Sequence, residues 1–147
     1  MTIPKGQPAA IACIRGGEDF PGLRGTVTSY PVPYGSLVVA QISGLPEKEE
    51  GFFAFHIHEG DSCAGKDFSE TGSHYNPIGT EHPMHAGDLP PLLSNGGRAF
   101  LAVETGRFRP WEVIGRTAVI HFGMYDFHTQ PSGNAEKKIG CGVIRRL

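Results

Sequence analysis

The chain has 147 residues, and this length predicts one domain that can bury a single sizeable core. Its 21 glycines, 12 prolines and 39% hydrophobic residues favour a compact, turn-rich fold. Thirteen basic and fifteen acidic residues give a formal net charge of −2, which provides no electrostatic attraction toward nucleic acid or an anionic membrane. We therefore expect neither of these partners.

Apolar runs are short. The longest, Ala9 to Ile14, falls below the ~18 residues of a membrane span and is too short for the apolar part of a secretory signal. As the chain stands, the sequence predicts a cytoplasmic protein. The alternative is a periplasmic or secreted protein whose signal has been removed.

Short β-rich runs separated by Gly and Pro turns recur along the chain. Helical periodicity over ten or more residues is absent from the sequence. The pattern predicts an all-β, antiparallel sandwich or Greek-key barrel with almost no helix. The eight predicted strands are Ala9–Arg15, Leu23–Tyr30, Ser36–Ser43, Gly51–His58, Pro91–Ser94, Arg98–Glu104, Arg116–His121 and Cys141–Arg146.

Two connections between these strands are much longer than the rest. They run from Glu59 to Pro90 and from Phe122 to Gly140, and they contain most of the histidines. Loops of this length in a compact domain are usually functional or disordered. The concentration of histidine and proline favours function.

One predicted strand contains a histidine pair. In Phe53-Ala-Phe-His-Ile-His58, side chains alternate between the two faces, so the aromatic and aliphatic residues face the core while His56 and His58 share the opposite face. Two imidazoles on one face form a chelating pair. Taken alone, the same pattern also suits the exposed polar face of a half-buried strand.

The following loop adds a second set of potential ligands. His74, His82, His85 and Asp88 offer three imidazoles and a carboxylate, a set suited to tetrahedral Zn²⁺. A His-rich polar loop is the alternative. His121 ends a later strand, and with His56, His58 and one loop histidine it makes an all-nitrogen set that suits Cu(II). Seven candidate ligands for two four-coordinate metals require one shared imidazole.

These residues resemble the Cu,Zn superoxide dismutase family. The resemblance runs nearly end to end and its pieces occur in the family's order. They are Ala12–Gly16 (ACIRG), Phe55–Gly60 (FHIHEG), His74–Pro77 (HYNP), His85–Pro90 (HAGDLP), Gly115–His121 (GRTAVIH), Gly133–Ala135 (GNA) and Gly140–Ile144 (GCGVI).

The resemblance implies the family's fold, metals and ligands. The fold is an eight-stranded antiparallel Greek-key barrel, an immunoglobulin-like sandwich with two long functional loops. Copper is bound by His56, His58, His74 and His121; zinc is bound by His74, His82, His85 and Asp88, so that His74 bridges the two metals.

The resemblance also assigns the three cysteines. Cys63 and Cys141 occupy the positions of the family's disulfide. Cys13 matches the position of a buried free thiol in some members, so we expect an inert core residue.

The implied activity is superoxide dismutation. Copper cycles between Cu²⁺ and Cu⁺, oxidising one superoxide to O₂ and reducing a second to H₂O₂, while Zn²⁺ orders the loop. His74 leaves copper on its reduction, takes up a proton and supplies it to the peroxide. Superoxide is the expected small-molecule substrate, and a homodimer is possible.

Two positions depart from the family pattern. Lys138 stands where the family has an arginine beside copper, which keeps the anion-steering charge but loses the rigid fork. Tyr125 stands where the family has an aspartate that links a copper histidine to a zinc histidine, and Asp126 follows one residue later. Asp126 therefore takes over this link or leaves it weaker.

Three further expectations concern the remaining residues. The loop between His82 and His85 is shorter than in most relatives, and His128 matches no ligand and is expected on the surface. We expect the side chains of Glu59, Asp61, Arg107 and Arg109 to be solvated charges. The alternative to the enzyme is a non-catalytic member of the family that stores or delivers copper or zinc.

Overall fold

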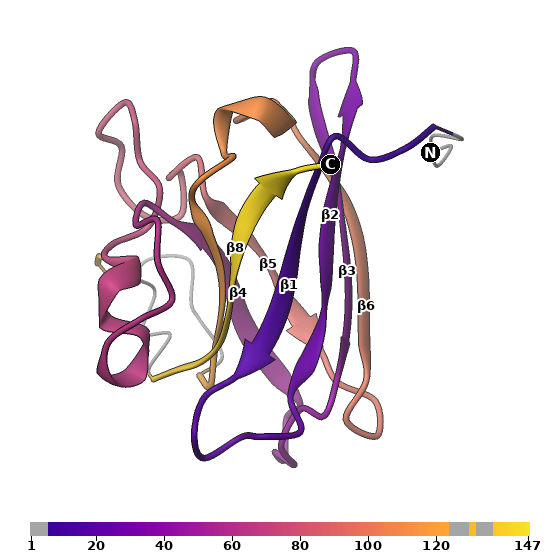
Figure 1. Cartoon of the computed structure of the whole chain (residues 1–147), viewed down its shortest axis with the longest axis vertical. Helices are drawn as coiled ribbons and strands as arrows, with labels where there is room; N and C mark the ends of the chain where they lie inside the picture. The colour runs from indigo at the N-terminus through magenta and orange to yellow at the C-terminus, as the bar shows by residue number, and fades with distance from the viewer. Residues whose placement is uncertain (1–5, 124–129, 132–136) are drawn as a thin grey trace.

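The computed structural model describes residues 6–123, 130–131 and 137–147, whose strands form one antiparallel sheet curled into a nearly closed barrel (Figure 1). The strand order is β5-β4-β7-β8-β1-β2-β3-β6. The connections from β3 to β4 and from β6 to β7 join strands that are not neighbours, as in a Greek key. The strands are β1 (Ala10–Gly16), β2 (Arg24–Val32), β3 (Gly35–Ser43), β4 (Phe52–His58), β5 (Asp88–Leu93), β6 (Ala99–Thr105), β7 (Thr117–His121) and β8 (Lys138–Arg146).

The predicted all-β fold is confirmed, but two strands, β5 and β8, begin three residues earlier than predicted. The sequence pattern predicts that β5 begins at Pro91, whereas the strand begins at Asp88, which pairs with His56 on β4. Consecutive prolines signal a loop, but proline is tolerated on a strand at the edge of a sheet. Because β5 is the last strand in the sheet order, it can accommodate them.

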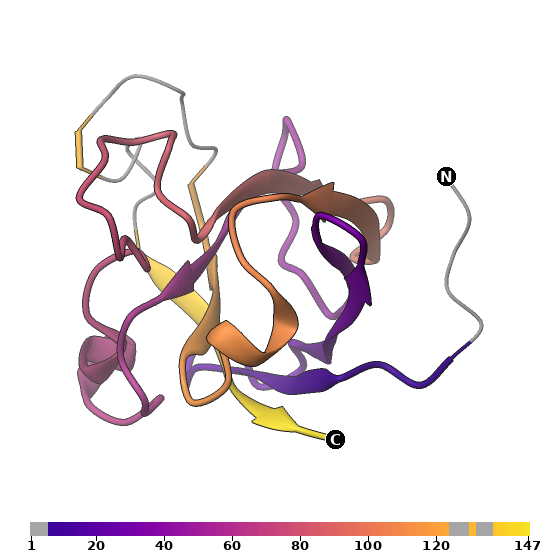
Figure 2. The same cartoon turned by 90° about the horizontal axis from the view of Figure 1, so that it is seen from above.

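The core fills the barrel interior and comes from alternating positions on the strands. On β4, Phe53, Phe55 and Ile57 are essentially inaccessible to solvent and belong to the main hydrophobic cluster, as the alternation predicted. Seen from above, the strands surround this core and the segment from Glu59 to Gly87 projects from one side (Figure 2). Both faces of β4 are therefore covered.

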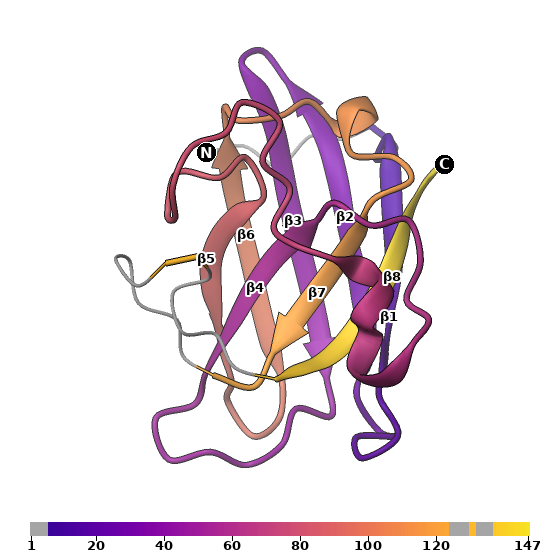
Figure 3. The ribbon, with the colours of Figure 1, turned by 90° about the vertical axis from the view of Figure 1, so that its left-hand side faces the viewer.

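Helix is scarce in the described part of the chain, which contains two short 3₁₀ elements, η1 (Lys66–Thr71) and η2 (Pro110–Glu112). The segment from Glu59 to Gly87, including η1, lies against the β4, β7 and β8 side of the barrel (Figure 3). Among the described residues, no helix is long and apolar enough to cross a membrane.

A disulfide fastens this segment to the barrel. Cys63, just ahead of η1, is bonded to Cys141 on β8, with their Cα atoms 5.9 Å apart. This is the pairing that the family resemblance implied. Cys13 corrects the other expectation, because it is exposed rather than buried. Ala12 and Ile14 point into the core from β1, so Cys13 between them points outward.

We predict that removing the disulfide destabilises the metal-free protein substantially. The bond joins residues 78 positions apart, and a loop of this length predicts a loss of about 4 kcal/mol in the free energy of unfolding. Urea unfolding of the double variant Cys63→Ser, Cys141→Ser measures this loss. Cys13→Ser is the matched control, and it should leave the urea midpoint unchanged. An unchanged midpoint in the double variant would contradict the prediction.

Candidate metal centre

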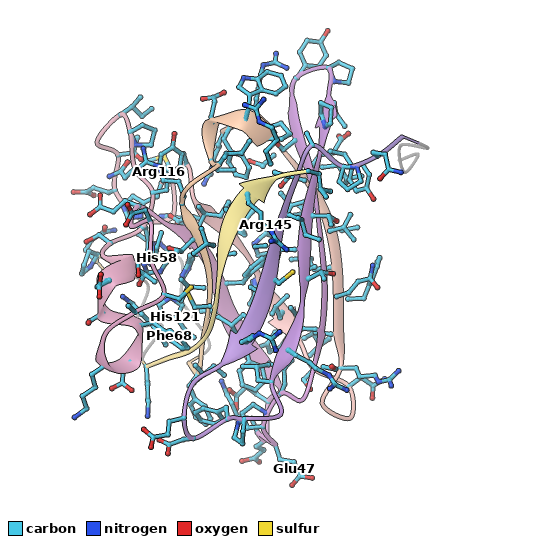
Figure 4. All side chains as sticks on the ribbon, in the orientation of Figure 1. Glu47, His58, Phe68, Arg116, His121 and Arg145 are labelled. Atoms are coloured by element: carbon cyan, nitrogen blue, oxygen red, sulfur yellow. A yellow bond between two sulfur atoms is a disulfide. The ribbon has the colours of Figure 1, made fainter. Side chains whose placement is uncertain are left out.

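Strands β4 and β7 bring three histidines together beside the barrel. The two strands pair from Phe55 opposite Ile120 to His58 opposite Thr117. His58 Nε2 lies 3.0 Å from His121 Nε2, and the ring centroids of His56 and His121 are 5.0 Å apart. Figure 4 shows His58 and His121 between the barrel and the segment from Glu59 to Gly87, the covering segment.

His74 completes this group from the covering segment. The backbone here runs beside β4, with an isolated bridge between His58 and His74 and a 2.8 Å hydrogen bond from Tyr75 N–H to the Ile57 carbonyl. The His74 ring consequently packs against His56, with 3.9 Å between centroids. One nitrogen from each of four buried residues lies within 4.8 Å of the others; they are His56, His58, His74 and His121.

A second group converges on the carboxylate of Asp88. His74 Nδ1 lies 2.8 Å from Asp88 Oδ1, whereas His82 Nδ1 and His85 Nδ1 lie 3.1 and 3.4 Å from Oδ2. All four residues are buried. Three imidazole nitrogens around one carboxylate form the donor set of a tetrahedral zinc site.

Glycine permits the backbone arrangement that places Asp88. A Cβ at Gly87 would lie 2.2 Å from the carbonyl oxygen of Ile57, so no other residue fits beside β4 at this point. Gly87 also exchanges backbone hydrogen bonds with its neighbours, donating to the Tyr75 carbonyl and accepting from Ile57 N–H, both at 2.9 Å. Asp88 therefore enters the cluster directly opposite His56.

His74 belongs to both groups. Its Nδ1 faces Asp88 and His85, while its Nε2 is buried and, among the described residues, has no hydrogen-bond partner. A buried polar nitrogen without a partner is costly unless something coordinates it. A metal on each side of this ring would satisfy both nitrogens, so the residues present fit two metal ions.

The surroundings favour the neutral form of three of these imidazoles, the form that metal binding requires. Burial, together with the nearby His121 ring, lowers the pKa of His58 from its ordinary 6.5 to about 2. Burial likewise lowers the pKa of His56 and of His85. For Asp88, burial raises the pKa, but the hydrogen bond from His74 and the electrostatic influence of the three neighbouring histidines together outweigh it, so the net pKa lies below the usual range.

One contact also fixes the tautomer of His58. Its Nδ1 lies 2.8 Å from the carbonyl oxygen of Gly72, which can only accept, so Nδ1 carries the proton. Nε2 of the neutral ring then presents a lone pair toward His121. Such outer contacts orient metal-binding imidazoles.

Lys138 lies where solvent reaches this group. A pocket of about 480 Å³ is lined by His58, His74, His121 and Lys138, among others. Strands β7 and β8 shift register after Ile120, and this shift places Lys138 opposite His121. The Lys138 ammonium donates to Thr71 Oγ1 at 2.7 Å and to the Gly72 carbonyl at 3.1 Å.

The neighbouring lysine has a different environment. Lys137 Nζ lies 3.2 Å from Asp19 Oδ2 and 3.6 Å from Asp67 Oδ1, so its charge is largely balanced. Lys138 has no acidic partner within salt-bridge distance among the described residues. The two adjacent lysines therefore contribute differently to the potential at the pocket.

The arginines make contacts that the sequence did not predict. Arg107 is exposed, as expected of a solvated charge, but its Nη1 donates to the Pro83 and His85 carbonyls. Arg109 is partly buried, and its Nη2 donates to the Pro33 carbonyl. Glu59 and Asp61 are exposed as expected. Sequence reasoning also missed Gln130, whose side chain binds both backbone groups of His82. Contacts to distant backbone leave no local signal in a sequence.

Some of the predicted residues lie outside the described part of the chain. They are Tyr125, Asp126 and His128, together with the Gly133–Ala135 motif. The link that we expect Asp126 to make therefore stays a prediction.

Comparison with known proteins identifies the family. Residues 23–144 match the model of the copper/zinc superoxide dismutase family. The chain belongs to the copper/zinc superoxide dismutase family. Superoxide dismutase Cu-Zn 2 of Aquifex aeolicus is 36% identical over 126 residues, which cover 76% of this chain and 72% of that protein.

Two further comparisons place the chain within this family. The Cu/Zn superoxide dismutase from Brucella abortus superposes with a TM-score of 0.76 at 26% identity, covering 91% of this chain and 98% of the other. The mouse copper chaperone for superoxide dismutase is 34% identical over 124 residues, which cover 75% of this chain but only 43% of that protein. This chain therefore has the fold of the copper/zinc superoxide dismutases, and copper and zinc are its cofactors.

The buried neutral histidines predict an acid-sensitive metal-free protein. In the unfolded chain His58 takes up a proton near its ordinary pKa of 6.5, whereas in the folded chain it does so only near 2. The unfolded state binds more protons between these values, so stability falls as pH falls. From pH 7 to pH 5, His58 alone removes about 2 kcal/mol from the free energy of unfolding.

Urea unfolding of the metal-free protein at pH 7 and pH 5 measures this loss. His58→Gln removes the titrating group, so the free energy of unfolding of this variant should depend less steeply on pH. Equal unfolding free energies of the original protein at the two pH values would show that His58 titrates normally in the fold.

Proposed function

We propose that this chain is a single-domain Cu,Zn superoxide dismutase that converts superoxide into O₂ and H₂O₂. The observation that carries the proposal is His74, which belongs to both groups of buried residues whose ligand atoms lie within 4.8 Å of one another. One group contains Asp88, with His56, His74 and His82, and the other consists of His56, His58, His74 and His121. A protein that only needed zinc for stability would require the Asp88 group alone. The second, all-histidine group suits a metal that changes its oxidation state.

Each ligand is assigned from its place in the cluster. His56, His58, His74 and His121 would hold copper. His74, His82, His85 and Asp88 would hold zinc, with His85 assigned by its 3.4 Å contact to Asp88 Oδ2. Copper supplies one-electron redox chemistry, which zinc lacks. Three of the four proposed copper ligands, His58, His74 and His121, line the solvent-accessible pocket.

The protein's own residues would manage the protons. Reducing superoxide to H₂O₂ consumes one electron and two protons. His74 Nε2 points toward the copper group, so it can hold a proton at the reacting centre when it is not coordinated. Its Nδ1 stays fixed by Asp88 at 2.8 Å, which keeps the ring oriented while Nε2 gains and loses the proton.

Lys138 would attract the anionic substrate. Its ammonium lines the same pocket as His58 and His121 and lacks an acidic partner within the described residues. A focused positive charge raises the association rate of a small anion. The hydrogen bonds to Thr71 and Gly72 hold the ammonium at the pocket.

Direct measurement of superoxide decay tests the activity. Protein reconstituted with one copper and one zinc per chain should accelerate decay after pulse radiolysis, with a second-order rate constant approaching about 10⁹ M⁻¹s⁻¹. His121→Gln, which removes one proposed copper ligand and no zinc ligand, is the matched control and should lose this acceleration. Stoichiometrically bound copper without any acceleration would exclude the enzyme.

Replacing Lys138 should weaken substrate capture. We expect Lys138→Ala to lower kcat/KM roughly tenfold and to reduce its dependence on ionic strength, because the steering charge is lost. Lys137→Ala removes the same formal charge from a residue already paired with Asp19, so its effect should be much smaller. Equal effects of the two substitutions would mean that only net charge matters.

A copper or zinc storage or delivery protein is the second candidate. One of the similar proteins is a copper chaperone for superoxide dismutase, which shows that this fold also occurs in copper chaperones. The discriminating result is copper transfer to an acceptor protein at a useful rate without superoxide decay. A cytoplasmic location, the periplasmic or secreted alternative, and a homodimer stay predictions.

A further inference from the structure

The turn that carries two of the proposed zinc ligands is held from outside by an arginine that binds no metal. Only Pro83 and Met84 separate His82 from His85. Arg107 Nη1 donates to the Pro83 carbonyl at 2.6 Å and to the His85 carbonyl at 3.1 Å. We propose that Arg107 is a positioning residue that holds the His82–His85 turn in its zinc-binding form and slows zinc release.

The arginine is itself anchored to the barrel. The backbone N–H of Arg107 donates to Thr105 Oγ1 at 3.2 Å. The next residue, Phe108, is buried in the core, and its carbonyl accepts a 2.8 Å hydrogen bond from the buried Ser36 hydroxyl on β3. The backbone at Arg107, just after β6, is therefore fixed. Its guanidinium can hold the His82–His85 turn in a fixed position relative to the barrel.

A second side chain binds the other end of the same turn. Gln130 Oε1 accepts from His82 N–H at 2.9 Å, and Gln130 Nε2 donates to the His82 carbonyl at 2.7 Å. Arg107 and Gln130 thus occupy three carbonyls and one N–H of the turn. Inside it, His85 N–H donates to Asp88 Oδ2 at 3.0 Å, so the held backbone connects directly to the carboxylate.

Such contacts matter because the affinity of a short turn for a metal depends on how well ordered the turn is before the metal binds. A turn that is mobile without zinc loses conformational freedom on binding, and this loss reduces the affinity. A charged donor on two carbonyls gives stronger hydrogen bonds than a neutral donor would. Arg107 therefore places His82 and His85 before zinc arrives.

The geometry also predicts which replacement is tolerated. Both carbonyls accept from one nitrogen, Nη1, so the planar fork of arginine is not used. A lysine ammonium has several donors on one nitrogen and can satisfy both carbonyls. Arg107→Lys should therefore retain the clamp, whereas Arg107→Gln should lose it.

The test uses copper-free protein loaded with zinc alone. We expect Arg107→Gln to release zinc to a competing chelator about tenfold faster, in the range seen when residues behind metal ligands are replaced. Arg107→Lys should release zinc at nearly the original rate. Arg109→Gln is the matched control, because Arg109 follows the same strand but reaches the Pro33 carbonyl instead.

Two further readouts separate positioning from general stability. With Co²⁺ in place of zinc, Arg107→Gln should alter the visible absorption bands of the metal, because the positions of His82 and His85 change. The metal-free form of this variant should lose much less stability than its zinc-loaded form. The proposal is overturned if zinc release is unchanged, or if the metal-free form loses as much stability as the zinc-loaded form.

The clamp rests on the proposed zinc site, and Asp88→Asn separates the two. If Asp88→Asn weakens zinc binding while Arg107→Gln does not, the zinc site stands and the clamp is wrong. If Asp88→Asn binds zinc as tightly as the original protein, the zinc assignment fails and the clamp fails with it.

Discussion

The shared position of His74 is the constraint on which the rest of this structure depends. Its ring lies between the Asp88 carboxylate on one side and the β4 and β7 histidines on the other. An imidazole has only two nitrogens, and here each faces a different group of ligands. Any movement of the ring would disturb both groups at once, so the surrounding contacts serve largely to fix it.

Burial of so many imidazoles is costly and must be offset. Removing polar nitrogens from water is unfavourable unless they find partners, and the depressed pKa of His58 expresses this cost as a preference for the neutral ring. Metal coordination offsets the cost, and the neutral state is the one that metals need. The acid sensitivity of the metal-free fold and its readiness to bind metals thus have one physical origin.

The covering segment is secured to the barrel at several points. The disulfide joins it to β8, and Arg116 Nη1 donates to the Glu59 carbonyl at 2.9 Å while its guanidinium lies over the Tyr75 ring. Thr117 Oγ1 donates to the Gly60 carbonyl at 3.2 Å. These attachments keep the segment over the histidines of β4, and Arg107 extends the same principle to the far end of the cluster.

The sequence by itself determined the all-β class, the strands and the identity of the candidate ligands. These features depend on local patterns: alternation along Phe53–His58, glycine and proline between strands, and histidines at recognisable spacings. The family resemblance supplied the ligand grouping and the disulfide. The errors were local too. Cys13 was assigned by resemblance, although its neighbours on β1 already place it outward, and consecutive prolines concealed the start of β5.

Only the tertiary structure decided how these residues meet. The register shift that sets Lys138 beside His121, the ion pairs that separate Lys137 from Lys138, and the reach of Arg107 to the Pro83 carbonyl all join positions far apart in the chain. Side chains that bind distant backbone need no particular neighbours in sequence. Their roles follow from packing in space, which no local pattern records.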